Sequence, residues 1–221
     1  DTTVYEPTAG NGMLLIGANP ELVTANELNA DRAETLRQIM PDATITEGNA
    51  LEHDFEAGSF DVVIENPPFG KVGDISNIDH NIANNSLRAL KDDGRAVLIL
   101  GGVQASTDEG RQEGYRGKAK REFYYTLYNT YNVVDHFTVG GNMYGKQGTT
   151  YPVDVIVIDG VGKSKRDLPA ADLPQLITSY EQLKEKLNES RVVPGESERP
   201  SGTDVGVGAE GQVGGEGVAP G

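Results

Sequence analysis

The stretch FDVVIENPPFG, residues 60–70, joins an apolar run to an ending with two prolines and an aromatic residue. The run from Phe60 to Glu65 is rich in β-branched residues, which predicts a strand with a buried centre. The next four residues, Asn66 to Phe69, include two prolines that cannot donate to a sheet ladder, so the strand ends there. A strand that delivers a rigid loop and an aromatic ring to its end is typical of a functional loop on a scaffold.

Segments on both sides of this strand alternate between strand and helix patterns. Further strands are predicted at Thr2 to Glu6, Leu22 to Leu28, Ala43 to Glu47, Arg95 to Leu100, Asn132 to Val139 and Pro152 to Ile158. Helices are predicted at Gly10 to Ile16, from Asn29 or Ala30 to Met40, from Ile82 to a stop at Asp93-Gly94, over 118–129, and from Asp172 to about Glu189. The alternation predicts an α/β fold with a mostly parallel sheet and helices on both faces. Because no helix separates the last two strands, an antiparallel strand is expected at one edge.

The length and composition of the chain limit the possible size of the core, the location of the protein and the kinds of metal site. The 221 residues suffice for one full core with a tail, and the apolar share of 37% suggests that part of the chain does not fold. The apolar runs are too short to span a bilayer, and no signal peptide opens the chain, so a cytoplasmic location is expected. Cysteine is absent and the three histidines lie far apart, so no metal site is expected.

The net charge of −15 opposes binding to nucleic acid unless positive charge is gathered in one place. One stretch meets that condition: RQEGYRGKAKR at 111–121 contains Arg111, Arg116, Lys118, Lys120 and Arg121 against a single acid, Glu113. Its plainest interpretation is a solvated loop and helix start. If it lies at the ligand-binding edge of the sheet, it can instead contact a phosphate backbone.

Ligands of such sheets bind at the carboxyl ends of the strands. The loop after the first strand, EPTAGNGM at 6–13, has glycines at 10 and 12 that let a ligand approach the backbone. Glu27 ends the second strand and can accept hydrogen bonds from ribose hydroxyls. Asn49 follows the third strand and can bond an adenine edge, with Ala50 and Leu51 beside the ring. Each of these could be an ordinary turn residue, but together they predict a nucleoside-containing cofactor.

The chain resembles the class I S-adenosylmethionine-dependent methyltransferases, specifically those that methylate exocyclic amino groups. The resemblance rests on four motifs that occur in this order: EPTAGNG, NEL, GNAL and NPPF. The likeness covers roughly residues 1–160 and implies a Rossmann-like, mostly parallel seven-stranded sheet with an antiparallel edge strand. It implies S-adenosyl-L-methionine as the cofactor. The cofactor-binding residues that it implies are Glu6, Pro7, Ala9, Gly10, Gly12, Glu27, Leu28, Asn49, Ala50 and Asn66, although the position of Asn49 is usually aspartate in the DNA adenine branch.

The NPPF loop has a chemical rationale of its own. An aromatic amino nitrogen is a poor nucleophile because its lone pair is delocalised into the ring. The side-chain oxygen of Asn66 and the carbonyl of Pro67 can accept its hydrogens and direct the lone pair at a sulfonium methyl group. Pro67 and Pro68 fix these acceptors in advance, and Phe69 offers a face on which a base can stack. Asn66, Pro67, Pro68 and Phe69 are therefore the predicted catalytic residues.

The substrate is not fixed by this loop, because enzymes with the motif act on adenine in DNA, on adenine or guanine in RNA, and on protein glutamine. The motif EPTAGNG most resembles that of the DNA adenine branch, so DNA is the preferred substrate. The predicted substrate-binding residues are Phe69, Arg111, Arg116, Lys118, Lys120, Arg121 and Lys146. A non-catalytic cofactor-binding module is disfavoured by the intact NPPF loop, and an NAD-dependent oxidoreductase by Glu6 and by Leu15.

Three parts are expected along the chain. Residues 1–160 form the catalytic domain, residues 161–191 a linker and an amphipathic helix, and residues 192–221 a disordered, glycine-rich acidic tail. DNA enzymes with this motif order usually carry a segment before the first strand that closes over the cofactor. The resemblance therefore suggests the methyltransferase portion of a larger phage or mobile-element protein, with a further domain or partner supplying target recognition.

Overall fold

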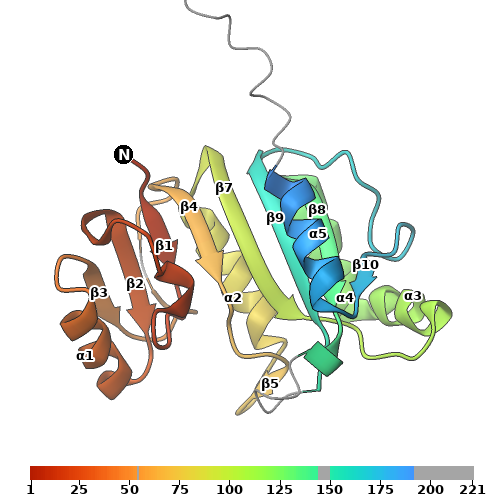
Figure 1. The fold of residues 1–221 in the computed structure, drawn as a ribbon, viewed down its shortest axis with the longest axis horizontal. Coiled ribbons are helices and arrows are strands. Elements are labelled where there is room, and N and C mark those ends of the chain that lie inside the picture. The colour runs from red at the N-terminus through yellow and green to blue at the C-terminus, as the bar shows by residue number, and fades with distance from the viewer. Residues whose placement is uncertain (54, 144–149, 192–221) are drawn as a thin grey trace, which may run out of the picture.

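The computed structural model describes residues 1–53, 55–143 and 150–191. Eight strands form one sheet in the order β10-β8-β9-β7-β4-β1-β2-β3 (Figure 1). The strands are β1 (Val4–Glu6), β2 (Val23–Glu27), β3 (Thr44–Glu47), β4 (Phe60–Glu65), β7 (Leu90–Gly101), β8 (Tyr131–Val139), β9 (Val153–Val161) and β10 (Gln175–Ile177). Two further strands, β5 (Lys71–Val72) and β6 (Ile75–Ser76), form a separate hairpin.

The α/β fold class is confirmed, with a large, mostly parallel sheet and one antiparallel strand. β1 pairs in parallel with β2 and β4, β2 with β3, and β4 with β7, whereas β9 is antiparallel to both β7 and β8. The prediction of an antiparallel edge strand was wrong in its position, because β9 lies between two strands rather than at an edge. The predicted count of seven also omitted β10, which pairs in parallel with β8.

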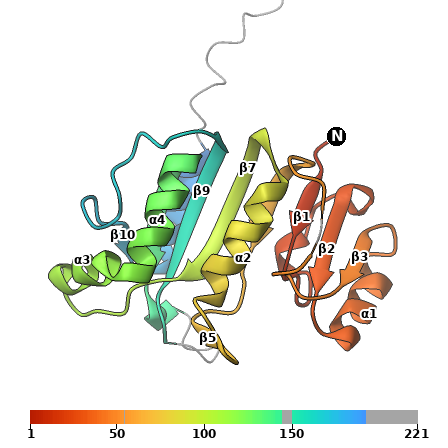
Figure 2. The ribbon, with the colours of Figure 1, turned by 180° about the vertical axis from the view of Figure 1, so that it is seen from behind.

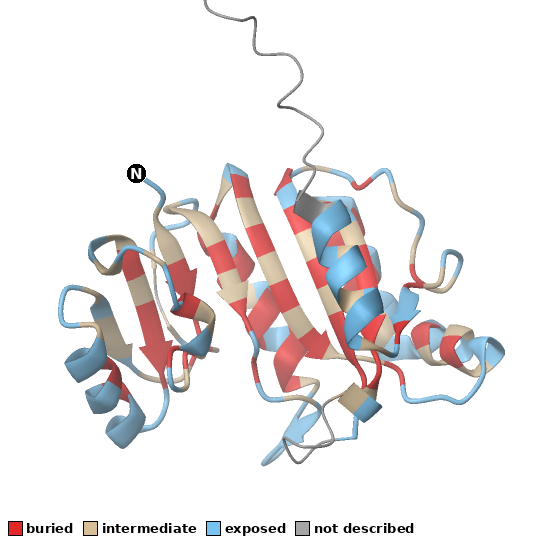
Figure 3. Ribbon diagram, in the orientation of Figure 1, coloured by how far each residue is buried: buried red, intermediate tan, exposed pale blue. Residues whose placement is uncertain are grey.

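Helices cover both faces of the sheet. The helices are α1 (Ala30–Ile39), α2 (Ile78–Ser86), α3 (Asp108–Arg116), α4 (Lys118–Thr130) and α5 (Tyr180–Arg191). α5 lies on the face seen in Figure 1, and α2 and α4 lie on the face seen in Figure 2. The largest apolar cluster joins β4, β7 and β9 to α2 and α4, and Figure 3 shows the buried residues concentrated along the central strands.

The predicted helix at Gly10 to Ile16 was wrong. Only a single 3-10 turn, Met13–Leu15, follows the glycine loop, and a second, Pro20–Leu22, precedes β2. Gly10, Gly12 and Gly17 adopt positive φ angles of 55°, 73° and 89°, which a helix cannot accommodate. Gly12 also lies against α1, since a Cβ there would come within 2.9 Å of Leu36 Cδ2.

Two other predicted helix boundaries were wrong. The helix before β7 ends at Ser86 with a 3-10 turn to Ala89, and Asp93-Gly94 lies inside β7, where the pairing with β4 shifts register. A Cβ on Gly94 would come within 3.0 Å of the Asp61 carbonyl oxygen, so glycine permits this close pairing. The predicted helix from Asp172 begins only at Tyr180, because Pro174 interrupts it and 175–177 join the sheet.

Beyond β9 the chain stays on the domain. α5 packs over β8 through Leu183, and Lys186 forms an ion pair of 2.9 Å with Asp135. The predicted tail at 192–221 lies outside the described residues. In the part of the chain that is described, no helix has both the length and the apolar composition needed to cross a membrane.

Candidate active site

Each of the four strands on one side of the sheet ends in a glutamate: Glu6 on β1, Glu27 on β2, Glu47 on β3 and Glu65 on β4. Because these strands are parallel, their ends meet at one edge of the sheet. Glu6, Glu27 and Glu65 are buried, and Glu47 is exposed. Three carboxyl groups are therefore held below the loops that were predicted to bind the cofactor.

A cavity of about 420 Å³ lies at this edge. Its wall combines polar groups from the strand ends with an apolar side from the NPPF loop, the β5–β6 hairpin and α2. Eight of the predicted residues line it: Pro7, Gly10, Glu27, Leu28, Asn49, Ala50, Asn66 and Pro68. Glu6, Ala9, Gly12 and Pro67 do not line the cavity, although all but Gly12 lie beside residues that do.

Glu27 connects the glycine loop to α1. Its carboxylate accepts hydrogen bonds from the backbone N–H of Gly10 (2.8 Å), the backbone N–H of Asn29 (2.8 Å) and the guanidinium of Arg32 (2.6 Å). Burial alone would raise the pKa of Glu27, but these hydrogen bonds outweigh it and hold the pKa below its usual value. Glu27 is therefore ionised and fixed in the cavity wall, and Arg32 lies beside it.

Asn26 fixes the two loops that flank Glu27. Its side-chain NH₂ group donates to the carbonyl of Pro7 (3.0 Å) and to that of Gly48 (2.9 Å). Its side-chain oxygen accepts a hydrogen bond from Thr46 (2.9 Å). These contacts hold the loops after β1 and β3 in a fixed spacing, so the cavity is formed before any ligand binds.

Beneath the cavity, several buried polar atoms have no hydrogen-bond partner in the described structure: Glu6 Oε2, Thr8 Oγ1 and Glu65 Oε1. Burial, together with repulsion from Glu65 and Glu27, raises the pKa of Glu6 to about 8. Burial also raises the pKa of Glu65 to about 8, in spite of a 2.5 Å hydrogen bond from the Ser86 hydroxyl. Of these three residues only Thr8 lines the cavity, so its hydroxyl is the one available to a ligand.

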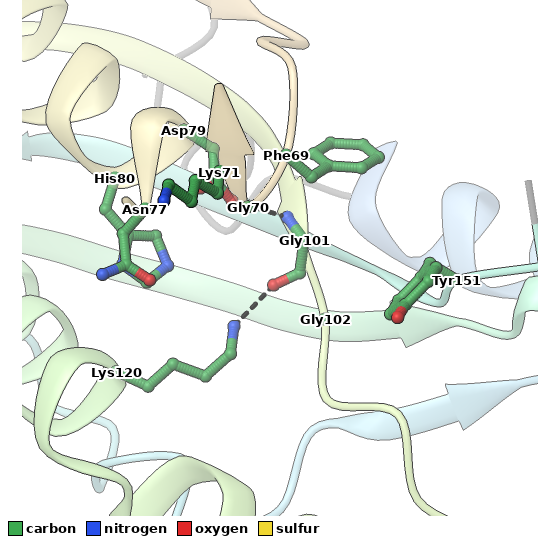
Figure 4. A pocket seen from close by; sticks show the side chains of 10 residues that line it. All are labelled: Phe69, Gly70, Lys71, Asn77, Asp79, His80, Gly101, Gly102, Lys120 and Tyr151. Atoms are coloured by element: carbon green, nitrogen blue, oxygen red, sulfur yellow. Dashed lines mark hydrogen bonds between the residues drawn. The ribbon is translucent and has the colours of Figure 1, made fainter. Parts of the chain in front are cut away.

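Figure 4 shows a second cavity, of about 510 Å³. It lies next to the first, because Pro68 lines the first cavity and Phe69 lines the second. Its lining residues come from the loop after β4, the start of α2, the end of β7, α4 and the segment before β9: Phe69, Gly70, Lys71, Asn77, Asp79, His80, Gly101, Gly102, Lys120 and Tyr151. It contains the aromatic residue of the NPPF motif, one carboxylate, two lysines and a histidine.

The end of β7 is clamped inside this second cavity. The backbone N–H of Gly101 donates to Asp79 Oδ2 (3.0 Å), and Lys120 Nζ donates to the carbonyl of Gly101 (2.5 Å) (Figure 4). A Cβ on Gly101 would come within 3.2 Å of both Asp79 Oδ2 and Phe69 Cβ. A side chain at position 101 would therefore require Asp79 or Phe69 to shift by a few tenths of an ångström.

His80 forms part of the wall of the second cavity. Its ring stacks on Phe123 with the centroids 4.1 Å apart. Burial lowers the pKa of His80 to about 4, in spite of the opposing effect of Asp79. Burial also lowers the pKa of Lys120, against the attraction of Asp154 and Asp79. The histidine is therefore neutral near pH 7.

The NPPF loop lies between the two cavities. Asn66 and Pro68 line the first, and Phe69 lines the second. Pro67 is buried between exposed Asn66 and Pro68. The loop is therefore positioned to contact one ligand in each cavity.

The predicted basic cluster is divided by the structure. Arg111 is only 4% exposed, and its guanidinium donates to the carbonyl of Pro174 (2.5 Å) and to Thr138 (3.3 Å). It lies on α3 rather than in a loop, and its bonds hold the chain before β10 in place, so the structure does not support a substrate-binding role. Lys120 lines the second cavity, whereas Arg116, Lys118 and Arg121 are exposed. Lys146 lies outside the described residues.

Several site residues were missed by the sequence analysis. Thr8, Asn26 and Arg32 belong to the first cavity or its support, and Lys71, Asp79, His80 and Tyr151 line the second. Asn26 carried a usable signal, because an amide inside a predicted strand needs hydrogen-bond partners if it is buried. Asp79 carried none, since an acid in the first turn of a helix is common.

The sheet order and the helices on both faces give the domain a Rossmann-like α/β fold, with two neighbouring cavities along the NPPF loop. A family model described as the methyltransferase small domain matches residues 11–107. No curated protein sequence is significantly similar to the chain. The family match therefore covers the chain from the glycine loop to the segment after β7.

Solved structures with this fold include two from type I restriction systems. One is a protein from Vibrio vulnificus YJ016 assigned as the modification subunit of a type I restriction enzyme, with 14% identity, a TM-score of 0.58, and coverage of 87% of this chain and 49% of that one. A component of a type I R-M system gives 17% identity and a TM-score of 0.59, over 86% of this chain and 46% of that one. This chain thus spans about half the length of either.

A third similar structure is a protein from Listeria monocytogenes assigned as a class I S-adenosylmethionine-dependent methyltransferase. Its identity is 13% and its TM-score 0.58, over 85% of this chain and 63% of that one. The family match and the shared fold support S-adenosyl-L-methionine as the cofactor. The lining of the first cavity is compatible with this molecule: Glu27 would suit ribose hydroxyls, the apolar side an adenine ring, and the unpartnered Thr8 hydroxyl the methionine portion.

Proposed function

We propose that the protein transfers the methyl group of S-adenosyl-L-methionine to the exocyclic amino group of adenine in DNA. The observation that carries this proposal is the position of the NPPF loop between the two cavities. Asn66 and Pro68 line the cavity suited to the cofactor, and Phe69 lines the cavity beside it. An amino group next to Asn66 would lie between a methyl donor on one side and a stacking surface on the other.

The cofactor, when bound, supplies an activated methyl group on a sulfonium. Glu27 and Gly10 would hold the ribose side, and Ala50 with Leu51 would flank the adenine ring. Thr8 would face the methionine amino group, with Glu6 behind the cavity wall, and the ionised carboxylate of Glu27 would stabilise the positive centre.

The NPPF loop prepares the nucleophile. The side-chain oxygen of Asn66 and the carbonyl of Pro67 would accept the two amino hydrogens, which disfavours delocalisation of the nitrogen lone pair into the base. Because two prolines restrict the backbone, these acceptors need little reorganisation when the positive charge develops on nitrogen. Holding the donor and acceptor in adjacent cavities contributes to the rate through orientation.

A base in a duplex must leave the stack to reach this position. The second cavity, about 510 Å³ in volume, has room for a nucleobase beside Phe69. Exposed Arg116, Lys118 and Arg121 lie on or next to α4, whose Lys120 reaches the same cavity, and would contact the phosphate backbone. The similarity to a restriction-modification subunit favours DNA over RNA and protein. A further domain or subunit would supply target recognition, as the partial coverage of these relatives suggests.

The test is to incubate the protein with S-adenosylmethionine labelled in its methyl group and, separately, with unmethylated DNA, total RNA or protein extract. Label in N6-methyladenine of digested DNA is the expected result. Label confined to RNA nucleosides or to a peptide would show that the substrate is wrong while the chemistry is right. Tight binding of NAD without binding of S-adenosylmethionine would contradict the proposal altogether.

A further inference from the structure

The β5–β6 hairpin follows the NPPF loop and forms part of the wall of both cavities. Val72 and Ile75 line the first cavity, and Lys71 lines the second. Gly70 and Asn77, which flank the hairpin, also line the second. In the described structure this short segment therefore faces both proposed ligands at once.

The pairing of the hairpin explains this division. Val72 is opposite Ile75, and Lys71 is opposite Ser76. Directly opposed residues of an antiparallel pair project from the same face, and neighbours along a strand project from opposite faces. The hairpin therefore has an apolar face, formed by Val72 and Ile75, and a polar face, formed by Lys71 and Ser76.

Little in the hairpin itself holds it in place. Its four strand residues are all exposed, and an isolated two-stranded hairpin is marginally stable in water. Val72 is 48% exposed and Ile75 is 39% exposed, although both line a cavity. A ligand that fills the first cavity would cover both side chains and remove them from water.

Both ends of the hairpin have backbone geometry suited to a change of direction. Gly70 has a φ angle of 76°, and Asn77, which is not glycine, has a φ angle of 52°. The backbone N–H of Ile78 donates to the carbonyl of Gly70 (3.0 Å), which closes the base of the hairpin. The hairpin is thus one unit attached at a single closed base, with Lys71 next to that base.

We infer that the β5–β6 hairpin positions the substrate in response to the cofactor, so that filling the first cavity increases the affinity of the second. The inference rests on the proposed function. The cofactor packs against Val72 and Ile75 and orders the hairpin, and the ordered hairpin presents Lys71 to an anionic group of the nucleic acid. Lys71 is therefore a positioning residue for the substrate, and Val72 and Ile75 connect the two sites.

The test uses sinefungin as the cofactor analogue and a short fluorescent DNA duplex as the substrate probe. With the native protein, saturating sinefungin is expected to tighten duplex binding about tenfold, a typical coupling between two sites. Thermodynamic linkage requires saturating duplex to tighten sinefungin binding by the same factor. Equal duplex affinity with and without sinefungin overturns the inference.

Variants then assign the coupling to the hairpin. The double change Val72→Ser with Ile75→Ser is expected to reduce the tenfold factor to about one, while the protein keeps its melting temperature because both residues are exposed. Ile39→Ser, which changes an exposed apolar residue at the end of α1, is the matched control. In this variant sinefungin should still tighten duplex binding about tenfold. An undiminished factor in the double variant overturns the role of the hairpin.

Lys71→Gln separates positioning from cofactor binding. It is expected to weaken duplex binding in the presence of sinefungin and to leave sinefungin affinity alone unchanged. An unchanged duplex affinity in this variant contradicts the role of Lys71. Failure of the proposed function has a different signature, because the native protein would then bind no sinefungin or transfer no methyl group to DNA.

Discussion

The backbone N–H of Gly10 donates a 2.8 Å hydrogen bond to Glu27 Oε2, which joins the loop after β1 to the end of β2. This contact with a buried, ionised carboxylate fixes the conformation of the glycine loop, which is not part of a helix. The same carboxylate lines the first cavity, so a ligand bound there would share this anchor with the loop.

Replacing this anchor should weaken cofactor binding. Glu27→Gln removes the charge that pairs with Arg32 and disturbs the hydrogen bonds from Gly10 and Asn29. The Kd for S-adenosylmethionine is expected to rise roughly tenfold or more, since hydrogen bonds to charged groups contribute about 1.5–3 kcal/mol. Calorimetric titration measures this Kd. Glu47→Gln, an exposed glutamate at the end of β3, is the matched control and should bind normally.

Removing the side chain of Asn66 should separate binding from chemistry. Asn66→Ala deletes an acceptor for the amino hydrogens, and loss of one such preorganised group typically slows a reaction about 100- to 1,000-fold. Single-turnover transfer of labelled methyl groups should fall by that order, while cofactor affinity changes little. Parallel loss of both would instead assign Asn66 a structural role.

The buried carboxyl groups predict an unusual dependence of stability on pH. Glu6 and Glu65 have pKa values raised from 4.5 to about 8, so the folded protein binds more protons than the unfolded chain between these limits. The free energy of unfolding of the cofactor-free protein should therefore be greatest below about pH 4.5 for these two groups and decline as the pH rises towards 8.

Urea denaturation across this pH range measures the decline. Glu65→Gln keeps an oxygen that can accept from Ser86 and removes one titrating group, so its stability should fall less steeply with pH than that of the native protein. Glu52→Gln, an exposed glutamate in the turn after β3, serves as the control. An identical pH profile for Glu65→Gln and the native protein would contradict the buried, proton-bearing role of Glu65.

Arg111 and Arg116 should behave oppositely although both lie on α3. Arg111→Met leaves the Pro174 carbonyl without its donor and is expected to destabilise the fold by roughly 2 kcal/mol or more, as measured by urea denaturation. Arg116→Gln should leave stability unchanged and reduce the dependence of DNA affinity on salt, by a slope of about 0.9 for one lost phosphate contact. Equal stability of the two variants would contradict the structural assignment of Arg111.

The features predictable from the sequence were those with strong local signals. β4 was placed residue for residue, because its apolar run and the two prolines fix both of its ends. α1 was placed by its apolar spacing and by Asn29, whose side chain accepts from the N–H of Arg32 at the start of the helix. Most of the residues predicted to bind the cofactor also line the first cavity, because they lie directly at strand ends.

Features that depend on distant contacts were not predictable. The burial of Arg111 depends on a carbonyl that lies beyond β9 in the chain, and no local pattern indicates it. The second cavity combines α2, β7 and α4, so its residues are brought together only by the packing of those elements. The missing helix after β1 reflects three glycines with positive φ angles, whose conformations only the folded loop determines.

The position of β9 also has a consequence for the synthesis of the protein. Leu98 pairs with Ile156 and Phe137 pairs with Val155, so β8 reaches β7 only through a strand that is translated after both. A ribosome-bound chain that stops short of Val153 has β4 and its NPPF loop but lacks the strand that completes the sheet. Stalled chains of that length are expected to be protease-sensitive, and competence for catalysis would then arise late in translation, in one non-local step.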